Sequence, residues 1–171
     1  SFYSLQTTKY KNRNHEENPP KQKQLLKFIK AFIYKYDFHP VIDFETNATI
    51  QPDEAWIKEF HASFTTSPKL TSNGDPEKRS YKPDVLKWHR EVGSGFKFVI
   101  TTDEDINEIW RKYVDDDTIR VPKNRIWFMP CSGSRQEHVE KAPAVAEYAK
   151  AMNVNFSPRL HLLIWDMALK V

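Results

Sequence analysis

Three short polar clusters in this sequence carry side chains that could bind and orient a small polar ligand. They are Glu45-Thr46-Asn47, Ser67-Pro68-Lys69 and Met129-Pro130-Cys131-Ser132, and each follows a short apolar run. Amide, hydroxyl and ammonium groups are natural partners for the carboxylate or the ribose hydroxyls of a ligand. Together with Gln6 and Thr7 near the start of the chain, the clusters predict a site for a polar small molecule.

Each cluster also has a purely structural interpretation. Asn47 could make a turn in which the neighbouring threonines bond to local backbone. Ser67-Pro68 could simply end a strand, Lys69 could be a surface lysine, and Cys131 could be a small buried residue. A shared site is favoured because all the clusters are expected at the ends of strands.

The elements that would position these clusters alternate along the chain. Apolar patterns predict strands over residues 1–6, 40–45, 62–66, 96–100, 126–129 and 160–165. Helices are expected over 21–36, from Pro52 to about Phe60, over 83–91, from Thr101 or Thr102 to 113, and over 135–152.

This alternation predicts an α/β fold with a mainly parallel sheet and the helices outside. The sheet would be either open or part of a (β/α) barrel. Because the carboxyl ends of parallel strands meet at one edge, the polar clusters are expected on the same rim.

The composition indicates one domain over residues 1–171. The single cysteine, Cys131, excludes an internal disulfide and favours the reducing cytoplasm. No apolar run is long enough to span a membrane, and no signal peptide is visible. The net charge of +3 comes from scattered residues, so nucleic acid is not expected as a partner.

Six segments of the chain occur together in an order that is quite specific. They are Phe2–Gln6, Glu45–Thr49, Ser67–Leu70, Phe96–Val99, Ile126–Pro130, and Ser157–His161 with Trp165. The set resembles the 7-carboxy-7-deazaguanine synthases, a family of radical S-adenosylmethionine enzymes. The resemblance covers nearly the whole chain.

The resemblance implies a partial (β/α) barrel and a lyase reaction. Enzymes of this family convert 6-carboxy-5,6,7,8-tetrahydropterin to 7-carboxy-7-deazaguanine, on the route to queuosine and other 7-deazapurines. The implied cofactors are S-adenosylmethionine, a [4Fe-4S] cluster and Mg²⁺. The implied partners are the pterin substrate, a second copy in a homodimer, and an electron donor such as flavodoxin.

The resemblance also assigns roles to residues of this chain, although it identifies no catalytic side chain. The implied substrate-binding residues are Leu5, Gln6, Thr7, Met129, Pro130, Cys131, Ser132, His161 near the floor of the site, and Val171. The residues implied to bind S-adenosylmethionine are Glu45, Asn47, Ser67, Pro68 and Lys69.

One block of the family's sequence is absent. The family holds its cluster with a CxxxCxxC motif or a near variant, because the iron atoms need cysteine thiolates. Here that block would fall between about residues 8 and 20, where there is no cysteine. If the cluster-bearing segment is missing only from this sequence, the protein is a radical enzyme. If the deletion is real, the protein is an inactive relative that binds a nucleotide, a pterin or another protein.

Overall fold

The computed structural model describes residues 18–37 and 41–168, with side chains from Gln24 onward. The strand expected over residues 1–6 lies outside the described residues, and so do Leu5, Gln6, Thr7 and Val171. None of the described helices combines the length and the apolar character that crossing a bilayer requires.

The chain divides into two compact units, which are described separately. The first contains the described parts of Ser1–Glu45 together with Gln51–Ser63. The second contains Thr46–Ile50 and the chain from Phe64 onward. Most of the polar clusters lie in the second unit.

In the first unit, helix α1 (Asn18–Tyr36) confirms the long helix expected from the apolar periodicity. Its apolar stripe is largely exposed, since Ile29 is buried but Phe28 is 65% exposed. Apart from α1, the described part of this unit offers a short helix and most of one strand. It therefore has little apolar surface to cover a long helix.

Two expected boundaries in this unit are wrong. Strand β1 (Asp43–Thr46) begins at Asp43 rather than at residue 40, and Val41 is 91% exposed because Ile42 takes the buried side of the alternation. Helix α2 (Ala55–Phe60) begins after Pro52. The side chain of Asp53 accepts the backbone N–H of Ala55 at 3.0 Å and closes a turn ahead of the helix.

The strands follow one another across the sheet in sequence order, β1-β2-β3-β4-β5. The later strands are β2 (Ser63–Thr66), β3 (Gly95–Ile100), β4 (Ile126–Pro130) and β5 (Asn155–Phe156). The pairings β2–β3, β3–β4 and β4–β5 are all parallel. Sequential order means that successive connections step in one direction, as in a partial barrel and not as in a doubly wound sheet. The expected α/β fold class is confirmed.

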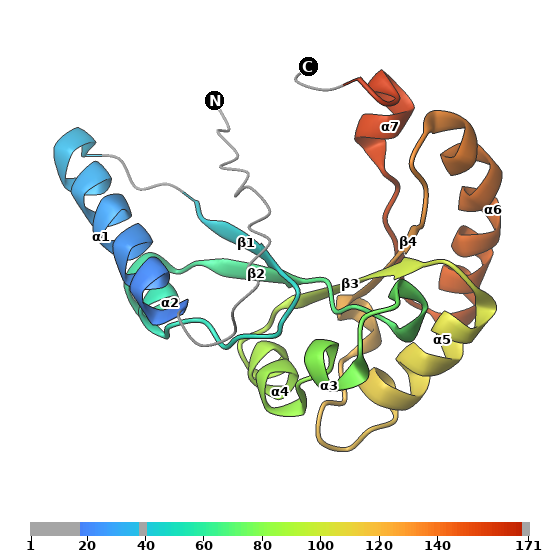
Figure 1. Cartoon of the computed structure of the whole chain (residues 1–171), viewed down its shortest axis with the longest axis horizontal. Coiled ribbons are helices and arrows are strands. Elements are labelled where there is room, and N and C mark those ends of the chain that lie inside the picture. Colours follow the sequence, from blue (N-terminus) through green and yellow to red (C-terminus); the bar gives the residue numbers. More distant parts are fainter. Residues whose placement is uncertain (1–17, 38–40, 169–171) are drawn as a thin grey trace. The chain divides into compact units, whose positions relative to one another are not determined.

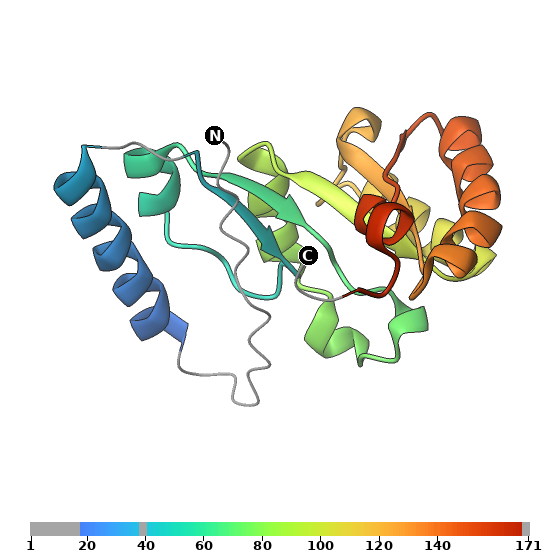
Figure 2. The same ribbon diagram turned by 90° about the horizontal axis from the view of Figure 1, so that it is seen from above.

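In the second unit, three helices lie along one face of β2 to β4 (Figures 1 and 2). They are α4 (Pro83–Glu91), α5 (Asp103–Ile109) and α6 (Arg135–Met152). The core between these helices and the strands includes Leu86, Phe96, Phe98, Ile100, Ile106, Ile109, Ile126, Phe128, Val145 and Ala149. The opposite face of these strands is called the inner face below.

Other connections in this unit contain short helices that the sequence does not signal. The loop expected over residues 71–82 contains a 3₁₀ turn at Thr71–Asn73 and helix α3 (Glu77–Ser80). The helix expected to run to 113 changes to a π-helical turn at Trp110–Val114. A further 3₁₀ turn, Lys123–Arg125, leads into β4.

The strand expected over residues 160–165 is wrong. Leu160–Trp165 forms helix α7, and the preceding strand is the two-residue β5. A six-residue apolar run has no decisive periodicity, and its leucines favour a helix.

Candidate ligand-binding edge of the sheet

Ser67 and Lys69 continue the alternation of β2 beyond the end of the strand. Pro68 and Leu70 are buried, and Leu70 belongs to the core beneath the helices. Because successive side chains in an extended segment point to opposite faces, Ser67 and Lys69 lie on the inner face, where both are half-buried. The hydroxyl and the ammonium group therefore share a face, while Pro68 packs on the other side.

Met129 and Cys131 lie on the same inner face at the end of β4. Met129 pairs in register with Val99, and the neighbouring Pro130 is buried on the helix side. The backbone N–H of Cys131 donates to the carbonyl of Ile100 at 2.9 Å, so the parallel ladder continues past the strand. The structure thus places alternate members of the second and third clusters on one face at the carboxyl ends of their strands, namely Ser67, Lys69, Met129 and Cys131.

An aromatic side chain covers the inner face nearer the amino ends of the strands. A Cβ atom on Gly95 would lie 2.9 Å from a ring atom of Trp127, so glycine allows the indole to approach the backbone of β3. Trp127 also pairs in register with Lys97. The polar edge of the inner face is therefore bordered by an aromatic surface.

The loop after β1 is a turn held by local hydrogen bonds, as the structural interpretation of Asn47 predicts. Asn47 Oδ1 accepts the hydroxyl of Thr49 at 2.9 Å and its backbone N–H at 3.3 Å. Thr46 Oγ1 accepts the N–H of Ala48, which is buried with a φ of 56°. The carbonyl of Thr46 accepts the N–H of Ser67 at 2.6 Å, so this turn adjoins the second cluster.

Two further sequence-predicted residues, Glu45 and His161, belong to other elements. Glu45 is exposed in β1 and belongs to the first unit. His161 is exposed in the first turn of α7. That helix is attached to α6 by Arg135, which donates to the carbonyls of Leu163 and Ile164, both at 3.0 Å.

The loop after β4 is tied to two other segments by a buried polar triangle. His138 in α6 is 2% exposed, and its Nδ1 lies 3.0 Å from Ser132 Oγ. Its Nε2 accepts the backbone N–H of Arg159 at 3.3 Å, and the guanidinium of Arg159 donates to the carbonyl of Ser132. Three segments that are distant in sequence therefore share one closed set of hydrogen bonds.

The triangle fixes the protonation of His138. Because Nε2 accepts a hydrogen bond, Nδ1 carries the ring proton and donates it to Ser132 Oγ. A cationic ring would direct a second N–H at the N–H of Arg159. Burial, followed by the charges of Arg159 and His161, lowers the pKa of His138. The imidazole is therefore neutral at physiological pH, in a single tautomer.

Other side chains of α6 hold the rest of this loop. Lys141 Nζ donates to the carbonyl of Cys131 at 3.0 Å, and Glu137 accepts the N–H of Gly133 at 2.8 Å. Ser134 caps the helix by accepting the N–H of Glu137 at 3.2 Å. The loop from Cys131 to Ser134 is thus bonded at nearly every residue.

The loop after β3 is held in the same manner. The carboxylate of Asp105, which is 2% exposed, accepts the backbone N–H groups of Thr101 at 2.7 Å and Thr102 at 2.9 Å. With Thr102 it forms the capping box of α5, as its position in the first turn predicts.

The residues present do not fit an iron–sulfur cluster. A [4Fe-4S] cluster needs several cysteine thiolates, whereas Cys131 is the one cysteine among the 171 residues. Within residues 18–37 and 41–168, no three His, Cys, Asp or Glu side chains are grouped so that they could hold a metal ion. The described part of the polar edge therefore offers hydroxyl, ammonium, thioether and thiol groups, and among its described residues there is no group of metal ligands.

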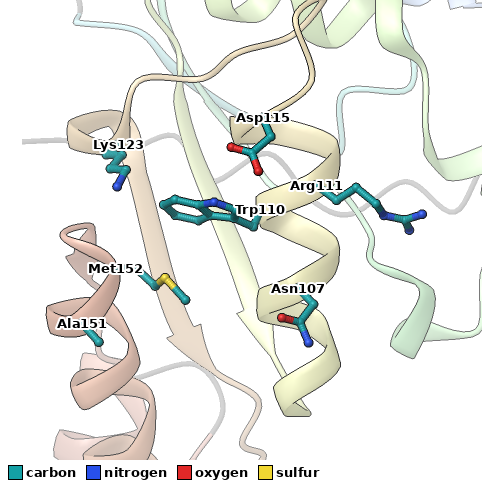
Figure 3. Close-up of a pocket in the computed structure, with 7 residues that line it drawn as sticks. All are labelled: Asn107, Trp110, Arg111, Asp115, Lys123, Ala151 and Met152. Atoms are coloured by element: carbon teal, nitrogen blue, oxygen red, sulfur yellow. The ribbon is translucent and has the colours of Figure 1, made fainter.

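A pocket of about 540 Å³ lies at the other end of the strands. It is lined by Asn107, Trp110, Arg111, Asp115, Lys123, Ala151 and Met152 (Figure 3). Lys123 precedes β4 and Met152 precedes β5, so the pocket opens at their amino ends. The ammonium of Lys123 lies 4.4 Å from the ring centre of Trp110. The pocket shares no residue with the polar clusters.

Sequence reasoning does not single out His138 or Arg159. A lone histidine inside a helix has no motif around it. The available signal is its spacing, because position 138 shares a helical stripe with Val145 and Ala149, both of which are buried. A polar residue on a buried stripe needs a hydrogen-bonding partner, and that argument would have identified it.

Fold and site together define the class of protein. It is an α/β protein in which strands β2 and β4 of one parallel sheet carry half-buried side chains on one face at their carboxyl ends. Ligands bind at this edge in other sheets built from strand–helix units.

Comparisons with known proteins indicate a particular family. The chain is 29% identical over 107 residues to the 7-carboxy-7-deazaguanine synthase of Pyrobaculum aerophilum, which covers 61% of this chain and 44% of that relative. It is 28% identical over 130 residues to the enzyme of the same name from Hyperthermus butylicus, covering 72% of this chain and 52% of that relative.

These two relatives confirm the resemblance to the 7-carboxy-7-deazaguanine synthases. The chain spans about half the length of the curated relatives that it matches. No family model matches the chain, and no solved structure matches it.

Proposed function

We propose that this chain forms the part of a 7-carboxy-7-deazaguanine synthase-like protein that binds S-adenosylmethionine and a pterin. The whole protein would be a lyase that converts 6-carboxy-5,6,7,8-tetrahydropterin to 7-carboxy-7-deazaguanine, on the route to queuosine. The observation that carries the proposal is that Ser67, Lys69, Met129 and Cys131 lie on one inner face. The two named relatives support it.

The chemistry of the inner face suits these ligands. The ammonium of Lys69 and the hydroxyl of Ser67 would bind the carboxylate and hydroxyl groups of S-adenosylmethionine, because charge-assisted hydrogen bonds are the strong ones. Met129 and Cys131 would lie against the flat pterin, where polarisable sulfur groups pack well on rings. In this proposal the side chains bind and orient, and a bound cofactor supplies the reactive chemistry.

The family's cluster has no ligand set here, so no step of the radical reaction is assigned to this chain. By resemblance, a protein that carries the missing segment would use a [4Fe-4S] cluster and Mg²⁺, work as a homodimer and take electrons from a donor such as flavodoxin. The single cysteine favours a second candidate function. In that case the chain is a non-catalytic relative that binds the same nucleotide or pterin.

Calorimetry of both ligands tests the shared part of the two candidates. Wild-type protein should bind S-adenosylmethionine and 6-carboxytetrahydropterin. The Lys69→Met variant should bind S-adenosylmethionine about tenfold more weakly, because it loses one charged hydrogen bond. Lys87→Met, at an exposed lysine of α4, is the matched control and should change neither affinity. Absence of binding by the wild type contradicts both candidates.

Anaerobic reconstitution of the full-length protein with iron and sulfide distinguishes the enzyme from the non-catalytic relative. Bound iron and turnover of the pterin identify the enzyme. Ligand binding without iron or turnover identifies the non-catalytic relative.

A further inference from the structure

We infer that His138 is a positioning residue, which fixes the loop from Cys131 to Ser134 so that the inner face presents Met129 and Cys131 to the ligand. The inference deepens the proposed function and rests on it for the identity of the ligand. It concerns a residue that touches no ligand. Its effect would pass through Ser132 and Arg159.

The position of Ser132 carries the first step. Its side chain is 4% exposed and points to His138 in α6, behind the inner face. Its carbonyl is occupied by the guanidinium of Arg159. Ser132 is therefore bonded by side chain and by backbone, and both bonds orient the peptide that follows Cys131.

The direction of the hydrogen bonds carries the second step. The neutral ring donates from Nδ1 and accepts at Nε2, so each nitrogen holds a different segment. A residue with one polar group could hold only one of them. His138 thus sets the spacing between the end of β4 and the segment after β5.

The consequence falls on the inner face. Cys131 is half-exposed there, and its backbone is held between Ile100 on one side and Lys141 on the other. Without His138, Ser132 would lose its side-chain partner and the loop would open more often. The side chains that precede it would then face the ligand in many arrangements instead of one.

Cys131 provides the reporter, because it is the one cysteine in the sequence. We would measure the rate at which iodoacetamide labels the Cys131 peptide, by mass spectrometry, with and without 6-carboxytetrahydropterin. His138→Ala should raise the rate without ligand by about tenfold, the factor that one buried hydrogen bond represents. His138→Asn keeps a donor near Ser132 and should restore part of the protection.

A second buried pair supplies the matched control. His89 faces Ser94 with the same 3.0 Å separation at the amino end of β3, so His89→Asn destabilises the unit without touching this loop. The inference is overturned if Cys131 is labelled at the same rate in His138→Ala as in the wild type. It is also overturned if His89→Asn raises the rate of Cys131 labelling as much as His138→Ala does. Should His138→Ala fail to fold, Ser132→Ala and Arg159→Met test the same triangle.

Ligand affinity gives a readout that a general loss of stability would not produce. His138→Ala should lower the affinity for the pterin about tenfold. Its affinity for S-adenosylmethionine should not change, because Ser67 and Lys69 follow another strand. Equal loss of both affinities overturns the positioning role. If the pterin fails to protect Cys131 in the wild type while His138→Ala still labels faster, the loop assignment stands and the proposed function fails.

Discussion

Two buried histidines of the second unit are each paired with a serine hydroxyl, yet they hold opposite ends of the sheet in different ways. His138 meets Ser132 after β4, and His89 meets Ser94 before β3, both at 3.0 Å. The second ring nitrogen of His138 is occupied by Arg159. That of His89 has no partner among the residues that the structure describes.

The surroundings of the two rings also differ, since those of His89 are aromatic and those of His138 are polar. His89 lies edge-on to Phe64 and Trp88, with ring centres 5.6 Å and 4.9 Å away. His138 lies among hydrogen-bonding groups of three segments. Packing gives stability without fixing directions, whereas a satisfied polar network specifies one geometry. The polar network is at the edge where the ligand is proposed to bind.

The largest expected difference between the two ends is the response of His89 to acid. Burial lowers the pKa of His89 from the ordinary 6.5 to about 4. The unfolded chain therefore binds more protons between these values, and stability should fall as the pH drops from about 6.5 to about 4, then level off. The loss from this residue should be roughly 3 kcal/mol.

Urea unfolding at several pH values measures this loss. His89→Gln cannot titrate, so its free energy of unfolding should depend less steeply on pH over the same window. His138→Gln is the comparison at the other end. Equal slopes for wild type and His89→Gln would refute the assignment of the acid response to His89.

The next effect concerns the carboxyl end of β3. Asp105→Ala removes two hydrogen bonds to the N–H groups of Thr101 and Thr102. Since both are accepted by one buried carboxylate, the free energy of unfolding should fall by about 2 kcal/mol. Asp105→Asn keeps one acceptor and should lose less. If Asp105→Ala costs no more stability than Glu104→Ala, at an exposed position of the same turn, the capping box adds nothing.

Replacing each serine compares the two pairs directly. Ser94→Ala and Ser132→Ala each remove one buried partner of a ring nitrogen, so each should reduce stability by about 1 to 2 kcal/mol. Only Ser132→Ala should also raise the labelling of Cys131. Thermal unfolding with parallel labelling checks both, and faster labelling in Ser94→Ala would remove the distinction between the ends.

Much of this fold follows from local pattern. Helix α4 begins at Pro83 and ends at Glu91 as expected, because Pro83 starts the first turn and Leu86 lies on a clear apolar face. The shared edge of Ser67 and Met129 also follows from sequence, since the alternation of strands and helices predicts a parallel sheet whose strands end along one edge.

The sequence predictions fail where the structure depends on contacts between segments that are distant in the chain. The run Leu160–Trp165 is a helix whose last carbonyls accept hydrogen bonds from Arg135 of α6, a contact that no local pattern reports. The His138 triangle joins residues 132, 138 and 159. It can be recognised only from the three-dimensional structure, in which α6 and the segment after β5 are adjacent.

The smallest expected effect lies at the amino-end pocket. Lys123→Ala removes an exposed ammonium from the ring of Trp110, and such a contact should contribute only about 0.5 kcal/mol to stability. Lys123→Arg keeps the charge over the ring and should match the wild type. Unfolding followed by tryptophan fluorescence measures both, and Cys131 labelling should not change in either variant. Because this pocket shares no residue with the polar edge, a change in pterin affinity would mean that the two ends of the sheet are coupled, and the division between them would have to be abandoned.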